Sequence, residues 1–384
     1  MATTPERLKI GLVLDTSLDP ADGVQQYVVA IGEWLSSQGH EVHYLVGQTD
    51  KRQLANIHGL ARNINVRFNG NRTTIPLPAG RKKLKQLIAR QKFDVLHVQT
   101  PHHPLMAQHL ILAADDSTAV VGTFHILPYG RLPRVGNRAL GIWLRPSLKR
   151  FDRIVSVSPV AAEFARASFK VKTDVLPNVV DYQRFASAKP LPQYNDNRLT
   201  ILFLGRLVPR KGCHTLLKAV AELAKQSRLP AFRVVICGIG PLEAKLRGFT
   251  NKHGLQDMVE FAGFVSEEDK PRYYASADIS VFPSSGGESF GIVLLEAMAS
   301  GRAAVLAGDN PGYRSVMEPH SDLLFDPANA GLLAQKIALY MTDDAERQAM
   351  GRWGAQYTAD FDVAKIGSKL VDIYQQALRK RRGL

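Results

Sequence analysis

Cysteine is scarce in this sequence, which contains only Cys213 and Cys237 among its 384 residues. Two cysteines cannot form the set of disulfides that stabilises many small secreted domains, and the spacing of this pair does not match a metal-binding motif. We therefore expect both to be small apolar residues of the core.

Long apolar runs are absent as well. No run approaches the ~20 residues that a helix needs to cross a bilayer. The short run at residues 10–14 is of strand length and has no signal-peptide architecture. With 45% hydrophobic and 22% charged residues, the composition is typical of a soluble globular protein, so we expect a cytoplasmic location. A chain of 384 residues is long enough for two domains, each with its own core.

Acidic residues are in the minority, and the resulting positive charge is uneven. Residues 1–190 hold 25 Lys and Arg against 14 Asp and Glu, a net charge of +11, whereas residues 191–384 hold 24 against 21, a net charge of +3. A basic field of this kind favours an acidic partner such as membrane lipid, nucleic acid or polyphosphate. The sequence has no convincing recognition element or aromatic residues spaced among the basic ones, so we expect no nucleic-acid partner.

Apolar runs of strand length alternate with stretches of helical pattern, and this alternation predicts an α/β protein with parallel sheets. Residues 181–197 are rich in proline and polar residues and are typical of an interdomain linker. The predicted strands are residues 8–14, 42–46, 93–99, 119–124 and 154–157 in the first half, and residues 199–204, 233–237, 259–264, 278–283 and 303–306 in the second.

Residues 281–301 form the segment around which the rest of the chain is best understood. A short apolar strand leads into a Ser/Gly loop at residues 283–287, and an apolar helix follows that Gly301 should end. Backbone amides in such a loop and the positive end of the helix dipole favour a phosphate. Glu288 and Glu296 bracket this turn, and ionised carboxylates can accept hydrogen bonds from the hydroxyl pairs of sugars. Alternatively, Glu288 caps the helix and Glu296 lies on its solvent-exposed face.

The spacing from Glu288 to Glu296, with Ser289, Phe290 and Gly291 after the first Glu, resembles the E-x7-E signature of the retaining group-1 (family 4) glycosyltransferases. The resemblance extends over nearly the whole chain and includes the bacterial phosphatidyl-myo-inositol mannosyltransferases within that family. The family has the GT-B fold, in which two Rossmann-like domains face each other across a cleft.

The resemblance implies a division of the chain into domains. An N-terminal Rossmann-like acceptor domain would span residues 1–186, and a C-terminal Rossmann-like nucleotide-sugar-binding domain would span residues 187–360. A C-terminal helix within residues 361–384 would cross back to the first domain. We expect the basic residues 379–382 at its end to be disordered and solvated.

A second motif follows the predicted strand at residues 199–204. Gly205 and Arg206 open a glycine-bounded loop that also holds Arg210 and Lys211. Cations in such a loop can bind a diphosphate, Arg through a fork of donors and Lys as a point charge. The resemblance implies that Arg206 and Lys211 neutralise the leaving nucleoside diphosphate, and we expect Arg210 to be solvated.

The resemblance also assigns roles to residues outside these two motifs. Glu288 would bind the sugar hydroxyls, Glu296 the ribose diol, and His125 the sugar from the opposite side. The turn at Gly23 would approach the donor phosphates, although Asp22 replaces the glycine that usually precedes it. The implied donor-binding residues are Gly23, Gly205, Glu267, Ser289, Phe290, Gly291 and Glu296, and the implied catalytic residues are Arg206, Lys211, Glu288 and His125.

Together these residues imply a retaining hexosyltransferase that moves a sugar from a nucleoside diphosphate sugar to an acceptor hydroxyl. Glu267 falls in the loop that would hold the base, and a carboxylate can accept from two N–H groups of guanine but from only one of uracil. We therefore predict GDP-mannose as the donor. One alternative is that Glu267 only starts a helix and the donor is a UDP-sugar. Another is a non-catalytic sugar-nucleotide sensor, which would be expected to have lost Arg206 and Lys211. We assign no nucleophile, and the resemblance implies that no metal or other cofactor is required.

Residues 81–90 have a basic amphipathic pattern that is able to lie on an anionic membrane. The cations are Arg81, Lys82, Lys83 and Lys85, and the apolar residues are Leu84, Leu87 and Ile88. The resemblance implies membrane contact through this helix, and hence a lipid acceptor and a peripheral position on the inner face of the cell membrane. Alternatively, the apolar residues pack on the sheet and the acceptor is soluble. Residues 129–149 are also basic and form either a lid or a surface that meets lipid.

Overall fold

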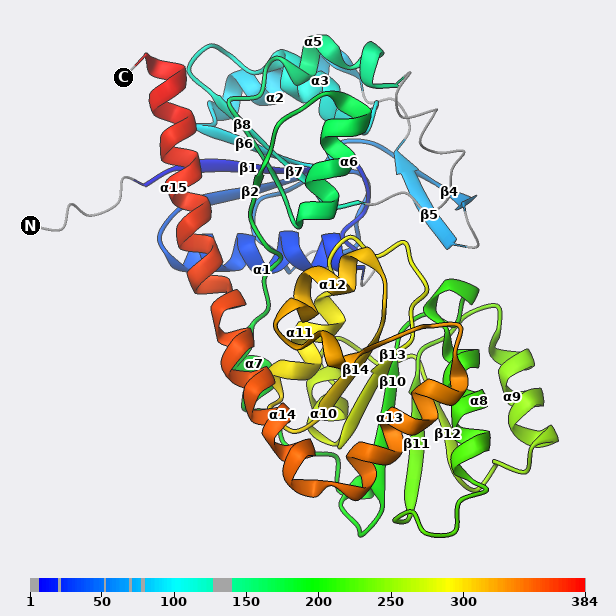
Figure 1. Ribbon diagram of the computed structural model, residues 1–384. Coiled ribbons are helices and arrows are strands. Elements are labelled where there is room, and N and C mark those ends of the chain that lie inside the picture. Colours follow the sequence, from blue (N-terminus) through cyan, green and yellow to red (C-terminus); the bar gives the residue numbers. More distant parts are fainter. Residues whose placement is uncertain are drawn as a thin grey trace, which may run out of the picture. The chain divides into compact units, whose positions relative to one another are not determined.

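The structure is a computed structural model that describes residues 7–19, 22–51, 53–68, 71–76, 80–126 and 140–383. The chain forms two compact units (Figure 1). Unit 1 comprises Met1–Val179 together with Val363–Leu384, and unit 2 comprises Val180–Asp362. Each unit contains a parallel sheet with helices packed on it, as the alternating strand and helix patterns predicted.

Unit 1 is built on a seven-stranded sheet of order β3-β2-β1-β6-β7-β8-β9, in which every neighbouring pair is parallel. The register places Ile10 of the central strand beside Val42 on one side and Val95 on the other. The strands are β1 (Lys9–Leu14), β2 (Glu41–Val46), β3 (Ile57–Gly59), β6 (Val95–Gln99), β7 (Ala119–Phe124), β8 (Arg153–Ser156) and β9 (Asp174–Val175).

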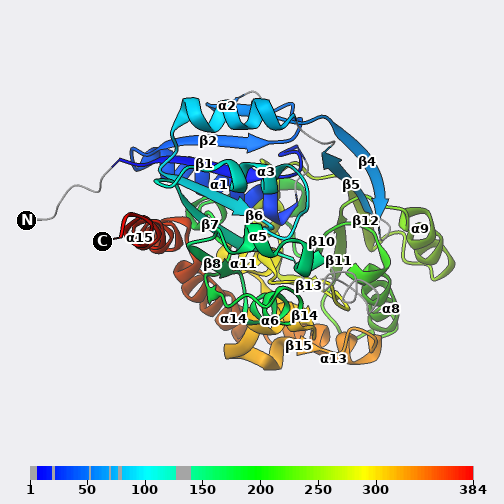
Figure 2. The same cartoon turned by 90° about the horizontal axis from the view of Figure 1, so that it is seen from above.

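Helices cover both faces of this sheet (Figures 1 and 2). Successive residues of β1 point to opposite faces, so Leu12 joins the core under α1 and α15, whereas Val13 joins the core under α2 and α3. Ser158 caps α6 as its Ser-Pro sequence suggests, because its side chain accepts from the N–H of Ala161 at 3.1 Å. The helices are α1 (Gly23–Ser37), α2 (Arg81–Gln91), α3 (Met106–Ala113), α5 (Arg145–Leu148), α6 (Pro159–Phe169) and α15 (Val363–Arg382). A separate antiparallel pair is formed by β4 (Asn63–Phe68) and β5 (Asn71–Pro76).

Unit 2 repeats the architecture with a six-stranded parallel sheet of order β12-β11-β10-β13-β14-β15. Cys213 and Cys237 are both buried free thiols, as expected. The strands are β10 (Leu199–Leu204), β11 (Phe232–Cys237), β12 (Val259–Gly263), β13 (Ile279–Phe282), β14 (Ala304–Gly308) and β15 (Leu324–Phe325). The helices are α7 (Tyr182–Ala186), α8 (Cys213–Leu223), α9 (Glu243–Lys252), α10 (Lys270–Ala275), α11 (Ile292–Ala299), α12 (Pro311–Met317), α13 (Ala330–Thr342) and α14 (Asp344–Thr358).

The division between the units falls earlier than the boundary that we predicted after residue 186. Helix α7 packs against α10 and α11 of unit 2, and the ring of Phe185 lies 5.9 Å from that of Tyr274. This apolar contact assigns α7 to unit 2. The chain returns to unit 1 after Asp362, where α15 begins.

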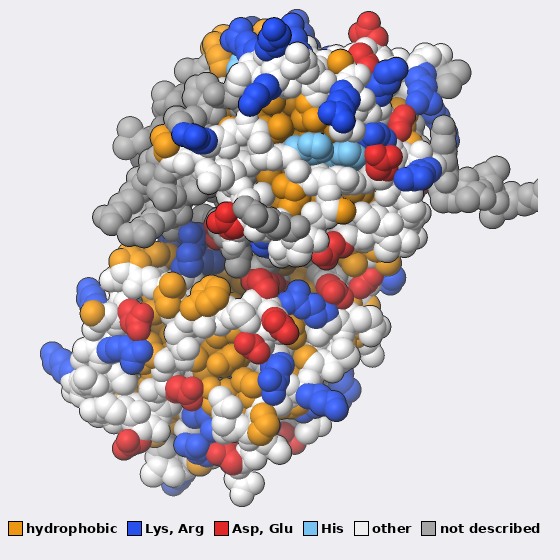
Figure 3. All heavy atoms as spheres, turned by 180° about the vertical axis from the view of Figure 1, so that it is seen from behind, with side chains coloured by type: hydrophobic (Ala, Val, Ile, Leu, Met, Phe, Trp, Pro, Cys, Tyr) orange, Lys and Arg blue, Asp and Glu red, His pale blue; other side chains and the backbone are white. Residues whose placement is uncertain are grey.

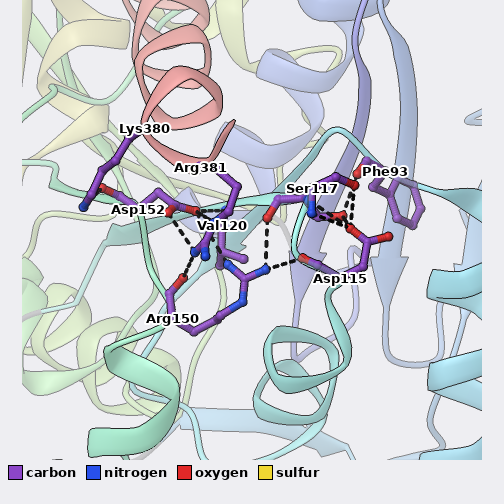
Figure 4. A network of polar contacts seen from close by, with 9 residues as sticks. Phe93, Asp115, Ser117, Val120, Arg150, Asp152, Lys380 and Arg381 are labelled. Carbon is purple, nitrogen blue, oxygen red and sulfur yellow. Dashed lines mark hydrogen bonds and ion pairs between the residues drawn. The ribbon is translucent and has the colours of Figure 1, made fainter. Parts of the chain in front are cut away.

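The basic C-terminal residues are helical, so the expectation that they are disordered is wrong, although Arg379, Lys380 and Arg382 are exposed as expected. Helix α15 continues to Arg382. Arg381 Nη2 lies 2.8 Å from Asp152 Oδ1, and Lys380 Nζ donates to the Asp152 carbonyl oxygen at 3.1 Å (Figure 4). Asp152 is 7% exposed. A buried carboxylate needs a compensating charge, and these side chains of α15 supply it.

Helix α2 buries its apolar side within unit 1. Leu84 and Ile88 belong to the core, and Leu87 packs against it. The structure therefore agrees with the alternative in which these residues pack on the sheet. The four cations of α2 are exposed, and Lys and Arg side chains gather at the upper end of unit 1 in the space-filling view (Figure 3).

Candidate active site

The loops that follow β10 and β13 lie side by side in unit 2, because the two strands are neighbours and the carboxyl ends of parallel strands meet at one edge of a sheet. Gly212 closes the first loop with φ of 71°. A Cβ at this position would lie 1.9 Å from the carbonyl oxygen of Pro283, so the close approach of the two loops requires glycine. Ser285 N–H donates to the carbonyl oxygen of Arg210 at 2.8 Å and joins the loops.

The carboxylate of Glu288 is held by three side chains from these loops. Its Oε1 lies 2.7 Å from Nη1 of Arg210 and 3.0 Å from Nζ of Lys211, and Ser284 Oγ donates to the same oxygen at 2.8 Å. Burial raises the pKa of Glu288, but the charges of Lys211 and Arg210 outweigh burial and hold this pKa below its ordinary value. The carboxylate is therefore ionised and fixed in position.

Two expectations about these residues are wrong. Arg210, which we expected to be solvated, has a side chain only 20% exposed and forms an ion pair with Glu288. The alternative in which Glu288 caps the following helix also fails, because Gly291 is the N-cap residue of α11. The pairing of Arg210 could not be predicted from local sequence, since its partner lies 78 residues away.

Gly205 and Arg206 begin the loop after β10. A Cβ at Gly238, in the loop after β11, would lie 2.0 Å from the Gly205 carbonyl oxygen, so this loop is packed closely on both sides. The side chain of Arg206 is half-buried. The same loop therefore carries Arg206 and Lys211, as predicted, at the edge of the sheet where Glu288 lies.

The three residues after Glu288 differ in what they can offer a ligand. Phe290 is 3% exposed and its ring lies 6.1 Å from that of Phe361, so its side chain belongs to the core of unit 2. Gly291 has φ of 130°, and a Cβ there would lie 2.7 Å from the ring of Tyr313. Ser289 is half-buried. Phe290 and Gly291 can therefore contribute only backbone groups to a donor site, next to the start of α11.

Glu296 lies inside unit 2, so the alternative that places it on a solvent-exposed face of the helix is wrong. It is 3% exposed. Its Oε1 lies 2.6 Å from Lys270 Nζ, and its Oε2 accepts from the Tyr274 hydroxyl at 3.2 Å. Burial raises the pKa of Glu296, and the Lys270 ammonium opposes this rise. Lys270 Nζ also lies 2.7 Å from Glu267 Oε2 and thus joins the two predicted donor ligands.

Lys270 and Ser284 were missed by the sequence reasoning. The pairing of Lys270 with Glu267 could have been predicted, because the two residues are three positions apart at the start of a helix and side chains at this spacing lie close together. Ser284 gave no comparable signal, because its role depends on a carboxylate brought to it by the fold of the loop.

His125 follows β7 in unit 1 and is 4% exposed. Its Nε2 lies 2.6 Å from Gln99 Oε1, and because an amide oxygen can only accept, the imidazole donates. The ring centroids of His125 and Tyr27 are 4.8 Å apart in an edge contact. Burial lowers the pKa of His125 to about 3, against an opposing hydrogen bond with Asn178. At neutral pH, His125 is therefore an uncharged hydrogen-bonding group.

A second buried histidine links the neighbouring strand to α15. His97 Nδ1 lies 2.7 Å from the hydroxyl of Tyr374, and its Nε2 lies 2.7 Å from Thr123 Oγ1. Burial lowers the pKa of His97 to about 3 as well. Gln99 and His97 were not predicted as site residues, although two polar residues at alternate positions of an apolar strand indicate a polar face.

Gly23 is the first residue of α1, and Asp22 is its N-cap residue in extended backbone conformation. Gln26 N–H donates to the carbonyl oxygen of Asp22 at 3.1 Å. The turn therefore ends in a helix N-terminus, as expected, and its approach to the donor phosphates stays a prediction.

Among the residues that the structure describes, no group of three or more His, Cys, Asp or Glu side chains is arranged to hold a metal ion. Over the same residues, no helix combines the length and apolar content that a membrane span requires.

Two family models match consecutive parts of the chain. The model for glycosyltransferase family 4 matches residues 21–184, and the model for glycosyl transferases group 1 matches residues 187–357. The two matches together cover parts of both units.

The chain is also similar to two mannosyltransferases over nearly its full length. It is 30% identical to the phosphatidyl-myo-inositol mannosyltransferase of Mycobacterium tuberculosis, with 96% of this chain and 97% of the relative covered. It is 27% identical to the GDP-mannose-dependent alpha-(1-6)-phosphatidylinositol monomannoside mannosyltransferase of the same species, with 91% and 94% covered.

Among solved structures, a glycosyltransferase from Rickettsia africae matches with a TM-score of 0.77 at 19% identity, over 97% of this chain and 99% of that one. At this identity the likeness concerns the fold alone. It confirms the predicted GT-B architecture of two α/β units.

Proposed function

We propose that this chain, which belongs to the group 1 (family 4) glycosyltransferases, transfers mannose from GDP-mannose to a hydroxyl of a phosphatidylinositol-type membrane lipid with retention of anomeric configuration. The observation that carries the proposal is the fixed, ionised carboxylate of Glu288 between Arg210 and Lys211. The names of two relatives, which act on phosphatidylinositol lipids, support the acceptor, and one of them names GDP-mannose as donor.

The donor would bind to unit 2. In this proposal Glu288 accepts hydrogen bonds from sugar hydroxyls, while Arg206 and Lys211 face the diphosphate. Negative charge develops on the diphosphate as the glycosidic bond breaks, and cations that are already in position stabilise it without reorganisation. Fixed side-chain cations would thus do the work that a metal ion does in other transferases, so we propose that no metal or other cofactor is needed.

Glu288 is poorly suited to act as a nucleophile. Its oxygen already accepts from three donors, and its lowered pKa marks a stabilised, weakly basic carboxylate. We therefore assign no covalent intermediate. Retention would follow from attack of the acceptor hydroxyl on the face that the diphosphate leaves, with a departing phosphate oxygen taking the acceptor proton.

His125 would contact the sugar from unit 1. Its pKa of about 3 means that it does so as an uncharged imidazole, which is able to hydrogen-bond a hydroxyl without placing a positive charge beside an electron-poor anomeric carbon. Gln99 holds the ring in one orientation through its bond to Nε2.

The acceptor is proposed to come from an anionic membrane that unit 1 approaches from the cytoplasm. The exposed cations of α2 and the net charge of +11 over residues 1–190 favour such a surface. Because the apolar residues of α2 lie in the core, α2 would contribute electrostatic attraction and not insertion.

Mass spectrometry of products can test this function. The protein is incubated with GDP-mannose and vesicles that contain phosphatidylinositol, and we expect a mannosylated lipid whose linkage has the anomeric configuration of the donor by NMR. Vesicles that contain phosphatidylglycerol instead are the control. Release of GDP without a lipid product would support GDP-mannose as the donor but refute the lipid acceptor. An inverted linkage would refute retention.

A UDP-sugar remains the second candidate donor, because Glu267 is engaged by Lys270 in the structure. In that case the same incubation with UDP-glucose or UDP-galactose would give the product. Calorimetry of GDP and UDP separates the two candidates without any acceptor.

A further inference from the structure

Unit 1 has an exposed apolar pair to which the proposed function assigns no role. Ile142 is 64% exposed and Trp143 is 63% exposed. An exposed tryptophan beside an exposed isoleucine is costly in water and is a feature of surfaces that bind a partner.

The local packing explains why these two side chains point outward. Residues 140–143 and α5 form two consecutive helical turns, and Leu140, Leu144 and Leu148 recur every four residues on the side that packs against α6. A Cβ at Gly141 would lie 2.7 Å from the carbonyl oxygen of Ser168, so this segment lies directly on the end of α6. Ile142 and Trp143 lie off this packed side and stay exposed.

Exposed cations follow the apolar pair along the chain. Four exposed cations lie on the same segment and on the chain that follows α6, and none has an acidic partner among the residues that the structure describes. They line a hollow together with Lys380. The four cations are Arg145, Lys149, Lys170 and Lys172.

The nearby acidic residues of this region are already paired. Asp152 is held by Arg381, Glu163 by Arg166, and the Asp174 carboxylate lies 3.7 Å from Arg153. The four free cations therefore keep their full charge toward a partner, and the hollow is positive.

This surface belongs to the same helical layer as α2. Helix α3 contacts α2 on one side and α5 on the other, and the three helices lie together at one end of unit 1 (Figures 1 and 2). Leu112 of α3 is also 58% exposed. The cations of α2 and the apolar pair can therefore meet one flat partner.

We propose that Ile142 and Trp143, with Arg145, Lys149, Lys170 and Lys172, form a docking surface for an anionic phospholipid bilayer. We call these six residues the Trp143 surface. The indole ring enters the head-group region, where tryptophan partitions favourably, and the cations contact lipid phosphates. The Trp143 surface supplies the apolar anchor that α2 lacks. This inference rests on the membrane acceptor of the proposed function and adds residues to which that function assigns no role.

A bilayer fits these residues better than the other anionic partners. Nucleic acid could contact the cations, but single-strand recognition relies on bases stacked on aromatic side chains. The aliphatic Ile142 offers no such ring and would stay exposed. An acidic protein would need a defined pattern of partners, whereas a bilayer accepts any cluster of cations around an apolar centre.

Vesicle co-sedimentation separates charge from insertion. For vesicles of phosphatidylcholine and phosphatidylglycerol, replacing Ile142 and Trp143 by Ala should weaken binding about tenfold, because their apolar area no longer leaves water. Replacing the four cations by Gln should weaken it by roughly fivefold for each charge removed, and this loss should shrink in high salt. The matched control replaces four exposed lysines of unit 2, Lys218, Lys225, Lys245 and Lys252, by Gln.

Fluorescence quenching tests the position of the indole ring directly. Brominated lipids should quench the emission of the wild type, and Trp143→Phe should remove most of this quenching while keeping most of the binding, because Phe is also apolar. The other two tryptophans, Trp34 and Trp353, remain in both proteins.

The outcomes discriminate between the two proposals. Binding that is lost when the α2 cations become Gln but unchanged in both Trp143-surface variants would overturn this inference and leave the lipid acceptor in place. Equal losses in the unit 2 control would overturn it too, since the effect would then be one of net charge. Binding to a DNA duplex but to no vesicle would refute both the surface and the membrane acceptor, whereas calorimetry of GDP on the same samples would show that the donor site is intact.

Discussion

In unit 2, the partly buried carboxylate of Glu288 is held by Arg210 and Lys211, whereas in unit 1 the buried imidazole of His125 is held by the neutral amide of Gln99. Both side chains are fixed, but only the first carries a charge at neutral pH. The difference follows from the partners. A buried charge persists only where opposite charges compensate its lost hydration, and without them the group becomes neutral.

This comparison bears on how each unit can act. A paired charge cluster is already organised for a charged ligand, and the proposed donor carries a diphosphate. A neutral histidine can hydrogen-bond a sugar but cannot compensate a phosphate.

The largest effect is expected from the cations of unit 2. Lys211→Ala and Arg206→Ala should each lower kcat by about 10²–10³-fold, because each removes a preorganised contact to the leaving group. Both variants should still fold, because Arg210 stays paired with Glu288 when Lys211 is removed. Arg247→Ala, which removes an exposed pair with Glu243 on α9, is the matched control and should leave kcat unchanged. If both site variants keep wild-type rates, Arg206 and Lys211 do not stabilise the leaving diphosphate.

The next effect comes from removing the charge of Glu288 while keeping its shape. Glu288→Gln leaves Arg210 and Lys211 close together without their counter-ion, so we expect a loss of about 2 kcal/mol in the free energy of unfolding along with lost turnover. Adding Arg210→Gln should restore part of the stability, because one unpaired charge is then removed. A double-mutant cycle by chemical denaturation measures this coupling, and strictly additive losses would show that the pair does not interact.

Much of this arrangement could be predicted from the sequence. The strand at residues 199–204 was predicted with the bounds of β10, and the shared edge of the sheet brought the predicted loops of Lys211 and Glu288 together. These features depend on local apolar patterns and on the rule that ligands bind at the carboxyl ends of parallel strands.

Other features could not be predicted because they depend on distant partners. The role of Arg210 depends on a carboxylate in another loop, and that of Arg381 on Asp152 in another part of unit 1. A basic run at a chain end has the composition of a solvated tail, and only the buried acid opposite it makes it a helix end. His97 is a similar case, since its partner Tyr374 lies on α15.

The neutral histidines make a third prediction, which concerns pH. Burial lowers the pKa of His97 and His125 to about 3 and that of His103 to about 4, and it lowers the pKa of His102 well below its ordinary value. Below about pH 6.5 the unfolded chain binds protons at these positions and the folded chain does not, so stability falls as the pH falls. Each histidine contributes a slope of about 1.4 kcal/mol per pH unit.

Asp15 opposes this trend in unit 1. Burial raises its pKa to about 7, so the folded state binds its proton between about pH 7 and 4 and gains stability as the pH falls, which offsets one of the four histidines. In unit 2, burial raises the pKa of Glu296 and of Asp278. These two groups therefore also stabilise the folded state as the pH falls. We therefore expect unit 1 to lose stability first on acidification.

Hydrogen exchange at several pH values can measure the two units separately. Amides of β6 and β7 should lose protection between about pH 6.5 and 5 while those of β10 and β13 keep theirs. His97→Gln should make the stability of unit 1 less dependent on pH, because unfolding then takes up about one proton fewer, even though the variant is less stable at neutral pH. Equal acid sensitivity of both units would contradict the contrast between a charged and a neutral site.

The smallest effect concerns the choice of base in unit 2, where Lys270 engages both Glu267 and Glu296. If Glu267 receives the guanine N1–H and N2–H, GDP should bind about tenfold more tightly than UDP, the value of one additional hydrogen bond to a charged group. Glu267→Gln should reduce this preference, because an amide oxygen accepts more weakly than a carboxylate. Lys270 would keep its pair with Glu296, so UDP binding serves as the internal control. Isothermal calorimetry of both nucleotides on both proteins measures the ratio, and tighter binding of UDP by the wild type would refute the guanine preference while leaving the charged cluster at Glu288 untouched.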